Sequence, residues 1–477
     1  MSSKEGRKVQ NYINGSWQPS LGKQCFEVSN AITEEALYQL TASSLQQVDM
    51  AVQAAKSSFL KWSLLTSNQR ADYLDSLFSL LQSRQTEIAE SITKEVGSTI
   101  DLSIGVQAAA AINKFSYYAD HLRSYPFEER FGDTPVLHEP IGVVACVTPW
   151  NFPLLQIAAK VAPALATGCT VVLKPSEVSP KNAAILAECI DEAGFPAGVF
   201  NMVWGEGSNI GEYLVGHKDI DMVSFTGSTA AGRRIAALAG KTIKRTSMEL
   251  GGKSAAIILD DADMETAIAG VLETCFVNAG QVCTAHSRLI VPSHRKAEAE
   301  EVAKYLAEQW NTGDPFDENT RLGPLVSEQH WQRVQSHIVA ALSSPEIKLL
   351  TGGVGRPDHL DRGYFVKPTV FSNVQPDDAL AQQEVFGPVI AILEASDDDT
   401  AIAIANNSIY GLSGGVWSVD SERAIQVAKR MRTGTVEING GTFNGSAPFG
   451  GYKQSGLGRE MGPYGFNEFL ELKTLQV

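Results

Sequence analysis

The sequence predicts an α/β protein with two doubly wound α/β domains and a small additional β element. Two successive series of apolar strands alternating with helices lead to this prediction, and a tail with alternating apolar residues adds the third part. The chain has 477 residues, 44% of them hydrophobic, so it can bury a large core. Typical domain sizes divide such a chain into two or three domains.

The first series follows a helical N-terminal region. Residues 46–121 place apolar residues three and four apart, and the proline-marked stretch 125–140 indicates a protruding hairpin. Ser179 and Pro180 form a suitable N-cap and first turn for a helix that stops at Gly194. The alternation then predicts strands at 141–148, 170–174, 199–204 and 221–225, and helices at 154–168, 180–194, 209–215 and within 226–239.

A second series follows without a low-complexity linker or an obvious repeat. The tail, residues 465–477, alternates like a strand and is predicted to be free to pair with another subunit. Chain order alone does not determine the topology of this second sheet. Its strands are predicted at 255–259, 288–291, 389–394, 414–418 and 434–439, and its helices at 264–278 and 295–310.

Composition excludes several classes of protein. The net charge is −15 and the pI about 5.1, which does not favour nucleic acid as a partner. The N-terminus lacks the apolar core of a signal peptide, and Lys160 and Pro163 interrupt the most apolar stretch, so no membrane span is predicted. Six cysteines in so long a chain do not suggest a disulfide framework, and a reducing, cytoplasmic setting is expected.

A glycine-containing turn follows the strand at 221–225. In "SFTGSTAAG" this turn leads into a helix, so backbone N–H groups and the helix dipole would face an anion. Gly227 and Gly232 are separated by four residues, which is not the full G-x-G-x-x-G fingerprint, and no P-loop lysine follows. Alone, the motif fits phosphate binding and a plain strand–helix turn equally well.

Charged residues follow the strand at 170–174 in "VVLKPSE". Lys174 and Glu177 lie outside the carboxyl edge of the predicted sheet, where they could hold the two hydroxyls of a ribose. A glutamate there would repel a 2′-phosphate. An isolated motif of this kind is more often a solvated loop.

Two further residues have side chains suited to catalysis. Asn151 in "TPWNFP" follows the strand at 141–148, and its neutral amide could donate to a developing oxyanion. Glu249 in "SMELGGKS" ends a strand, and a carboxylate in a partly dry site can act as a base for water. Singly, the asparagine is more often a turn former and the glutamate a surface or paired residue.

Cys283 stands on the loop "NAGQVCTAHSR" before an apolar strand. Most cysteines are inert buried residues, but "GQVC" can present backbone N–H groups that stabilise both a thiolate and a covalent oxyanion. Only His286 is close in sequence, so a Cys–His pair has weak support. No Cys-x-x-Cys or histidine cluster indicates a metal, and no metal ligand is predicted.

Together these motifs resemble the aldehyde dehydrogenase superfamily. "PWNFP", "KPSE", "FTGS", "MELGGKS", "GQVC", "EVFGP" and "PFGGYKQSGLGRE" occur in that family's order between residues 149 and 460. The resemblance implies that Cys283 is the nucleophile, Glu249 the general base and Asn151 the oxyanion donor. It implies oxidation of an aldehyde to the carboxylic acid with NAD, through a thiohemiacetal and a thioester on the cysteine.

The same resemblance implies the binding residues. Glu177 favours NAD, with NADP a less preferred cofactor. Expected to bind the cofactor are Trp150, Lys174, Ser176, Glu177, Gly207, Gly211, Phe225, Gly227, Ser228, Leu250, Glu384 and Phe386. The aldehyde tunnel is expected to be lined by Phe152, Gln156, Ala159, Val282, Thr284, Phe443 and Phe449.

Three parts of the chain are implied as well. Residues 1–121 and 142–250 would form a Rossmann-like cofactor domain, and 251–452 the catalytic domain. Residues 122–141 and 463–477 would supply the strands of an oligomerisation element in a homodimer or homotetramer.

Some alternatives remain open. An acylating, coenzyme A-dependent semialdehyde dehydrogenase commonly lacks the hydrolytic glutamate, and a catalytically silent binding or structural protein with this fold typically lacks the nucleophile; this sequence has both residues. No arginine or lysine stands among the expected tunnel residues, which does not favour a carboxylate-bearing aldehyde. His286 has no assigned role.

Overall fold

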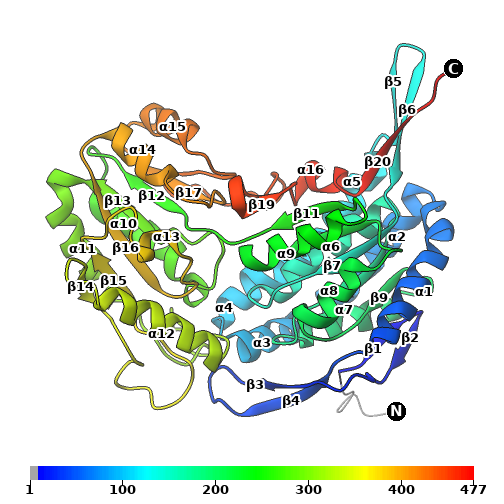
Figure 1. Ribbon diagram of the computed structural model, residues 1–477, viewed down its shortest axis with the longest axis horizontal. Helices are drawn as coiled ribbons and strands as arrows, with labels where there is room; N and C mark the ends of the chain where they lie inside the picture. The colour runs from blue at the N-terminus through cyan, green and yellow to red at the C-terminus, as the bar shows by residue number, and fades with distance from the viewer. Residues whose placement is uncertain (1–8) are drawn as a thin grey trace.

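Two large sheets organise the computed structural model, which describes residues 9–477 (Figure 1). The first has the strand order β19-β11-β10-β7-β8-β9-β1-β2, and its five central strands are parallel. Antiparallel strands form both edges. The strands are β1 (Asn11–Ile13), β2 (Ser16–Gln18), β7 (Val143–Val147), β8 (Thr170–Lys174), β9 (Phe200–Met202), β10 (Met222–Thr226), β11 (Arg245–Glu249) and β19 (Gly456–Leu457).

Helices cover both faces of this sheet, as the alternating pattern predicts. Val144 and Cys146 of β7 pack into one core and Val143 and Ala145 into another, because successive side chains of a strand point to opposite faces. The helices of this part are α1 (Leu45–Ser63), α2 (Ser67–Ser83), α3 (Gln85–Val96), α4 (Ile100–Leu102), the π-helix η1 (Ser103–Ala108), α5 (Ala109–Ser124), α6 (Pro153–Thr167), α7 (Lys181–Glu192), the π-helix η2 (Gly207–Gly211), α8 (Glu212–Gly216) and α9 (Thr229–Gly240).

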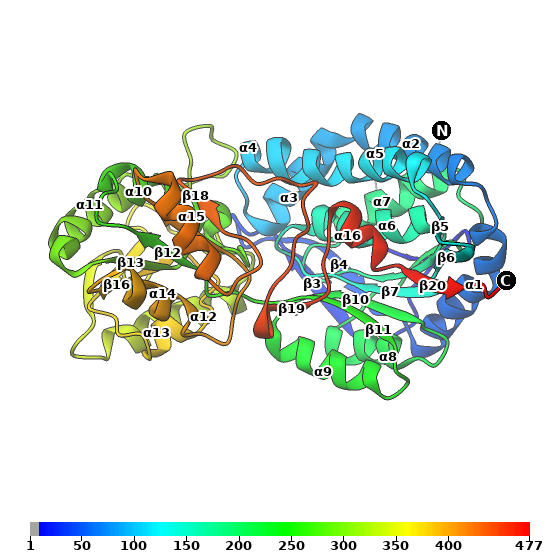
Figure 2. The same ribbon diagram turned by 90° about the horizontal axis from the view of Figure 1, so that it is seen from above.

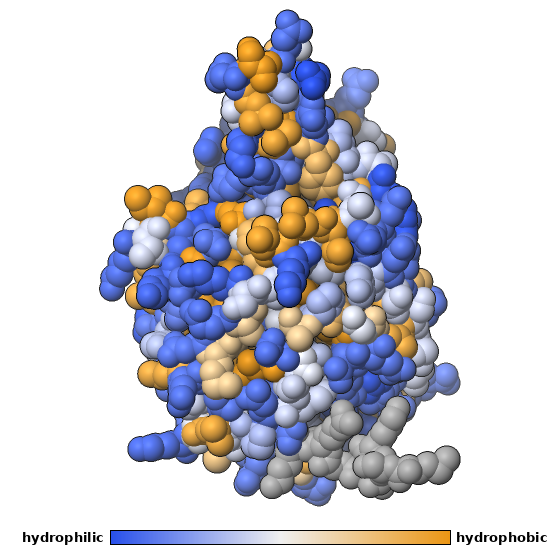
Figure 3. All heavy atoms as spheres, turned by 90° about the vertical axis from the view of Figure 1, so that its right-hand side faces the viewer, coloured by the Kyte–Doolittle hydropathy of each residue, from blue (hydrophilic) through white to orange (hydrophobic). Residues whose placement is uncertain are grey.

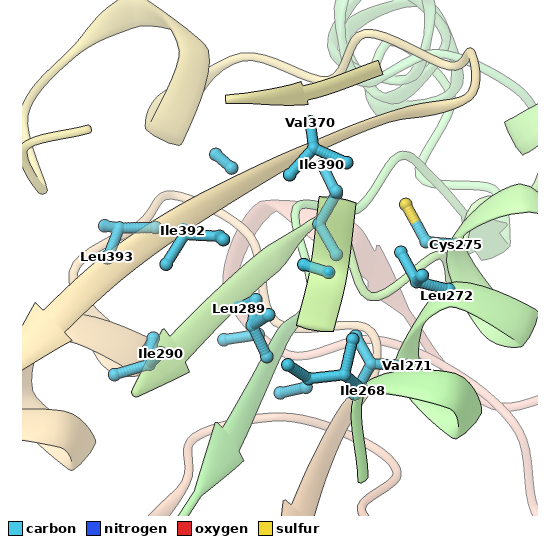
Figure 4. Close-up of a cluster of buried hydrophobic side chains, with 14 of the residues drawn as sticks. Ile268, Val271, Leu272, Cys275, Leu289, Ile290, Val370, Ile390, Ile392 and Leu393 are labelled. Carbon is cyan, nitrogen blue, oxygen red and sulfur yellow. The ribbon is translucent and has the colours of Figure 1, made fainter. Parts of the chain in front are cut away.

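The second sheet has the order β14-β15-β16-β13-β12-β17-β18 and is parallel except at β14. Ile268 and Leu272 of α10 belong to its core with Leu289 of β13 and Ile390 of β16 (Figure 4). Its strands are β12 (Ala255–Ile258), β13 (Arg288–Pro292), β14 (Lys348–Thr351), β15 (Thr369–Ser372), β16 (Val389–Ala395), β17 (Gly414–Trp417) and β18 (Glu437–Ile438). Its helices are α10 (Met264–Phe276), η3 (Val277–Gly280), η4 (Ser293–Arg295), α11 (Lys296–Glu308), α12 (Glu328–Leu342), α13 (Ala379–Gln382), α14 (Asp398–Asn406) and α15 (Ser421–Arg430).

The chain passes between the two lobes twice in its second half. It leaves the first sheet at β11 and enters the second at β12, then returns from β18 to β19 (Figure 2). The returning segment includes the short helix η5 (Lys453–Ser455). The two-stranded sheet of β3 (Cys25–Ser29) and β4 (Ala36–Thr41) lies in the chain between β2 and α1.

A projecting hairpin and the tail form a separate three-stranded sheet, β20-β6-β5 (Figure 1). It consists of β5 (Glu128–Phe131), β6 (Thr134–Pro140) and β20 (Leu470–Thr474). The prediction of a continuous strand through the tail is wrong in its first part, since Gly462–Asn467 is the helix α16. The tail strand also pairs with its own hairpin, antiparallel to β6, which leaves only one edge of β20 open.

The start of α7 also differs from the prediction. Pro180 is the N-cap, and the Ser179 hydroxyl donates to the Trp150 carbonyl at 3.2 Å instead of capping the helix. Ser179 thus links this turn to the segment after β7. The expected domain boundaries stay a prediction. Within residues 9–477, no helix combines the length and apolar character needed to cross a membrane.

Candidate active site

A cavity of about 420 Å³ lies at the carboxyl edge of the first sheet. The chain runs from β7 through β8 to β9 and then returns to place β10 on the other side of β7, so the strand order reverses there. Ligands of open α/β sheets bind outside such a reversal. The lining comes from both lobes and includes Pro149, Trp150, Asn151, Gln156, Thr226, Gly227, Ser228, Leu250, Gly251, Cys283, Ser327, His330, Arg333, Glu384 and Phe386.

Cys283 reaches this cavity from a sharply turned loop. Asn278 and Ala279 have left-handed backbone angles, with φ of 53° and 55°, and end the helical run after α10. Cys283 packs against a small apolar cluster of Leu412, Phe449 and Met461. Burial, followed by the carboxylates of Glu384 and Glu249, raises the pKa of the Cys283 thiol to about 12. The sulfur therefore needs a base to become a nucleophile at neutral pH.

Hydrogen bonds hold Asn151 in place beside the same loop. Its side-chain Nδ2 donates to the Gln281 carbonyl at 3.0 Å, and its own carbonyl accepts from Asn278 Nδ2 at 3.0 Å. Asn278 in turn accepts from Ser98, which Gln107 contacts at 2.7 Å. A primary amide has two donors, so Asn151 can still give one to a ligand oxygen.

Glu249 ends β11 in a dry environment. Its side chain is only 3% exposed, and neither carboxylate oxygen has a hydrogen-bond partner among residues 9–477. Burial, and then the nearby carboxylate of Glu460, raise its pKa well above the usual range. Lys160 forms a fully buried ion pair with Glu460 and also donates to Thr226 Oγ1 at 2.6 Å. The free oxygens of Glu249 can thus bind and deprotonate a small molecule such as water.

Two glycines bring the β11–β12 loop against the reacting residues. A Cβ atom on Gly252 would collide with the Cys283 carbonyl oxygen, and one on Gly251 with the Glu384 carboxylate. The Gly252 N–H donates to Glu384 Oε1 at 3.0 Å. Gly252 is therefore required for the close approach of this backbone to the loop that contains Cys283.

An aromatic wall closes one side of the cavity. The rings of Trp150, His330 and Phe386 lie 5.3–5.8 Å apart in edge-to-face pairs. His330 Nε2 donates to the Phe386 carbonyl at 2.7 Å, and burial lowers its pKa to about 4, so the ring is neutral. Sequence reasoning missed His330 and Arg333, which both come from α12, and only the helix-starting Ser327 marks that element locally.

The residues expected to bind a cofactor fall into two groups. Trp150, Gly227, Ser228, Leu250, Glu384 and Phe386 line the cavity. The others do not line it: Lys174, Ser176, Glu177, Gly207, Gly211 and Phe225. Lys174 and Glu177 do form an ion pair at 3.1 Å, and a Cβ on Gly211 would lie 3.8 Å from Lys174 Cδ. Ser228 is the N-cap of α9, and its side chain accepts from the Ala231 N–H at 3.2 Å.

Of the expected tunnel residues, only Gln156 lines this cavity. Val282 and Thr284 flank Cys283, Phe152 precedes α6 and Ala159 is buried within it. Phe443 meets Phe449 edge to face at 5.9 Å, and Phe449 belongs to the apolar cluster beside Cys283.

The sequence analysis did not identify a cation that lies near the segment containing Phe443. Lys114 of α5 is buried, and its Nζ donates to the Gly445 carbonyl at 2.6 Å, two residues from Phe443. Burial lowers the pKa of Lys114 to about 8. His286 has a structural place rather than a catalytic one, because its buried ring lies against Gly415 of β17 and 3.4 Å from Ser413 Oγ.

Comparison with known proteins agrees with this geometry. Residues 17–475 match the model of the aldehyde dehydrogenase family. The chain is 47% identical over 465 residues, 97% of each sequence, to a 3-succinoylsemialdehyde-pyridine dehydrogenase from a Pseudomonas species.

Solved structures show the same likeness. Aldehyde dehydrogenase C from Pseudomonas syringae, a mutant solved with NAD⁺ and octanal, superposes with a TM-score of 0.97 at 42% identity, covering 99% of this chain and 97% of that one. A betaine aldehyde dehydrogenase from Staphylococcus aureus with NAD⁺ gives 0.95 at 35% identity, covering 98% and 94%.

Proposed function

Because the chain belongs to the aldehyde dehydrogenase family, we propose that it oxidises an aldehyde to the carboxylic acid with NAD, using Cys283, Asn151 and Glu249. One observation carries the assignment of roles. A thiol and an amide donor line the cavity at the reversal point of the first sheet, and a buried carboxylate without a partner, Glu249, lies close enough to raise the pKa of that thiol. Each supplies a different requirement of the reaction: nucleophile, oxyanion donor and base.

The first half of the reaction forms a covalent adduct. As Cys283 sulfur bonds to the aldehyde carbon, its proton passes to a base, a role that we assign to Glu249, and the carbonyl oxygen becomes an oxyanion. The spare Asn151 N–H and the backbone N–H of Cys283 donate to that oxygen. When bound, NAD accepts the hydride whose loss turns the adduct into a thioester.

The second half releases the acid. After Glu249 has released the first proton to solvent, it takes a proton from water, the resulting hydroxide attacks the thioester carbon, and the carbon–sulfur bond breaks to return the thiolate. Glu249 can do this because its oxygens are free and its pKa is raised, so it is a stronger base than an exposed glutamate. This free carboxylate favours hydrolysis over transfer of the acyl group to coenzyme A.

The chain's own residues suit a dinucleotide. Gly227 and Ser228 place the first turn of α9, with its unpaired N–H groups, beside the cavity, which fits a pyrophosphate. Glu384 and Phe386 line the same cavity as Cys283. Lys174 and Glu177 form a charged pair at the end of β8. We assign Lys174 and Glu177 to the adenosine ribose, which makes NAD the preferred cofactor over NADP.

A substrate panel tests the proposed function. The full-length enzyme should oxidise aliphatic, aromatic and charged aldehydes with different kcat/KM values, with octanal among the aliphatic ones, and with NAD rather than NADP. The product should be the free acid whether or not coenzyme A is present. Formation of an acyl-coenzyme A ester, or no NADH with any aldehyde, would contradict the assignment.

We further propose that the three-stranded sheet β20-β6-β5 joins copies of the chain into a homodimer or homotetramer. Its outer strands expose Phe131 and Leu472, at 69% and 68%, and Figure 3 shows hydrophobic side chains on the projecting part at the top of the view. Light scattering on the full-length protein and on Leu472→Lys tests this assembly. A monomeric wild type would contradict it.

The cytoplasm is our proposed compartment. All six cysteines are unpaired in the described structure, and Cys283 must remain reduced to act as a nucleophile. Cell fractionation with an antibody against the protein tests this, and recovery from an oxidising compartment would contradict it.

A further inference from the structure

Asn278 begins the sharply turned part of the loop that contains Cys283, and it does not itself line the cavity there. Three successive residues, Asn278 to Gly280, have left-handed backbone angles, with φ of 53°, 55° and 73°. Glycine adopts this region freely and asparagine more readily than most residues, and a strained turn persists where surrounding contacts fix it. Asn278 is only 5% exposed, so its side chain is placed to make such contacts.

The side-chain amide of Asn278 joins the two segments that supply the oxyanion donors. Its Nδ2 donates to the Asn151 carbonyl at 3.0 Å and to the Gln281 carbonyl at 3.4 Å. The Gln281 carbonyl also accepts from the Asn151 side chain at 3.0 Å, which uses both lone pairs of that oxygen. Asn278 therefore holds Asn151 by its backbone, and it shares with Asn151 the acceptor that fixes the Asn151 side chain.

Two buried residues outside this loop determine which way the Asn278 amide points. Its Oδ1 accepts from the Ser98 hydroxyl, and Ser98 Oγ accepts from Gln107 Nε2 at 2.7 Å. A serine hydroxyl has one proton, and the donation from Gln107 leaves that proton for Asn278. A reversed amide would put its oxygen against the carbonyl oxygens of Asn151 and Gln281, which have no proton to give. The chain of donors therefore runs in one direction, from Gln107 to Asn151.

We infer that Asn278 is a positioning residue that directs the free amide N–H of Asn151 toward the oxyanion. The inference rests on the proposed function, because it requires Asn151 to donate to the adduct. One Asn151 amide proton is held by the Gln281 carbonyl, so the direction of the other depends on where that carbonyl and the Asn151 backbone lie. Asn278 bonds both of these groups. An oxyanion donor acts when it is directed at the position that the oxyanion takes, so a shift of Asn151 lowers the rate and leaves cofactor binding unchanged.

Asn278→Gly removes the amide while the left-handed backbone remains favourable, because glycine has no Cβ. We expect kcat to fall roughly tenfold to a hundredfold, which is less than the loss of about 10²–10³ typical of removing an oxyanion donor itself. The affinity for NAD should equal that of wild type, since Asn278 does not line the cavity. The matched control is Asn14→Gly, the same change at an exposed left-handed asparagine in the β1–β2 turn, which should keep the wild-type kcat.

A double variant separates positioning of Asn151 from a general weakening of the loop. If Asn278 acts through Asn151, adding Asn278→Gly to Asn151→Ala should cost no more than about threefold beyond Asn151→Ala alone, because residues that act as a unit have non-additive effects. Losses that multiply would overturn the inference.

Alkylation of Cys283 by iodoacetamide, without aldehyde or cofactor, gives a readout that does not depend on turnover. Mass spectrometry should show the same alkylation rate in Asn278→Gly as in wild type, because the inference leaves the thiol and its access unchanged. A changed rate would show that the loop itself has moved, and would also overturn the inference.

Ser98→Ala tests the same chain of donors if Asn278→Gly does not fold. It removes the hydroxyl that fixes the amide, so kcat should fall by a smaller factor, roughly threefold to tenfold, and this loss should vanish in the Asn151→Ala background. An unchanged kcat in Ser98→Ala and Asn278→Gly would contradict the positioning role. A wild type that oxidises no aldehyde would refute the proposed function and this inference with it, whereas an active wild type with multiplying losses would overturn this inference alone.

Discussion

The two doubly wound sheets each have a crevice at the carboxyl ends of their strands, and the carboxylates near the two crevices differ in their pairing. The crevice of the second sheet, about 400 Å³, lies at the ends of β12, β13 and β16 and is lined by Asp260, Asp398 and Arg423. Arg423 bonds Asp260 at 2.6 Å and Asp398 at 2.7 Å. In the first sheet, Glu249 has no partner and Cys283 faces the cavity.

The pKa shifts of Asp260, in the second crevice, and of Glu249, near Cys283, point in opposite directions. The hydrogen bond from Arg423 lowers the pKa of Asp260, whereas burial raises that of Glu249. Paired, exposed carboxylates stay ionised and inert, but an unpaired dry carboxylate is a strong base. The fold therefore provides a crevice twice, and beside the first one it leaves a buried carboxylate without a partner.

Removing the nucleophile should have the largest effect. We expect Cys283→Ala to lose aldehyde oxidation by several powers of ten while its affinity for NAD stays nearly unchanged, because the covalent route disappears and the cofactor contacts do not. Steady-state NADH formation and NAD titration measure the two quantities. Residual activity above about one per cent of wild type would refute the role of Cys283.

Removing the base should act on one half of the reaction. Glu249→Gln should slow turnover by about 10²–10⁴ while hydride transfer is affected less, so a burst of NADH should precede slow turnover. Stopped-flow absorbance resolves the two phases. If single-turnover and steady-state rates fall equally without a burst, the glutamate is not chiefly a hydrolytic base.

The pH dependence should report the same residue. Because burial raises the pKa of Glu249, the carboxyl takes up its proton at a higher pH than an exposed glutamate, and kcat should fall as the pH is lowered through that range. The matched measurement is the pH profile of Glu249→Gln, in which the fall of kcat at low pH should be absent. The same fall in the variant would show that another group causes it.

A smaller effect is expected at the end of β8. Glu177 should favour NAD over NADP by at least roughly tenfold in kcat/KM, since its carboxylate repels a 2′-phosphate. Glu177→Gln should narrow the ratio mainly by improving NADP. Equal use of both cofactors by wild type, or an equal loss with both in the variant, would argue against this role.

The smallest effect should come from the second crevice. Asp398→Asn breaks an ion pair with Arg423 that is about one-third exposed, so it should change the free energy of unfolding by no more than about 1 kcal/mol. Its kcat/KM should equal that of wild type. A large loss of activity with an unchanged fold would show that the second crevice also takes part in function.

Local pattern was sufficient for much of the architecture. The strands β7, β8, β9 and β10 and the helices between them lie where apolar runs and 3.6-residue periodicity predict them, because neighbouring residues determine both signals. Motifs at strand ends likewise identified Asn151, Glu249 and Cys283, and the structure places all three near one edge of the first sheet. Their catalytic roles stay predictions.

Only the tertiary structure decided the environment of these residues. Lys160 and Glu460 are 300 positions apart, yet they pair beside Glu249, and His330 reaches Trp150 from α12 in the other lobe. The pairing of the tail strand β20 with β6 of the hairpin likewise joins segments that are far apart in the sequence. Charge pairing, burial and sheet order depend on contacts between distant segments, and these contacts set which carboxylate has its pKa lowered and which has it raised.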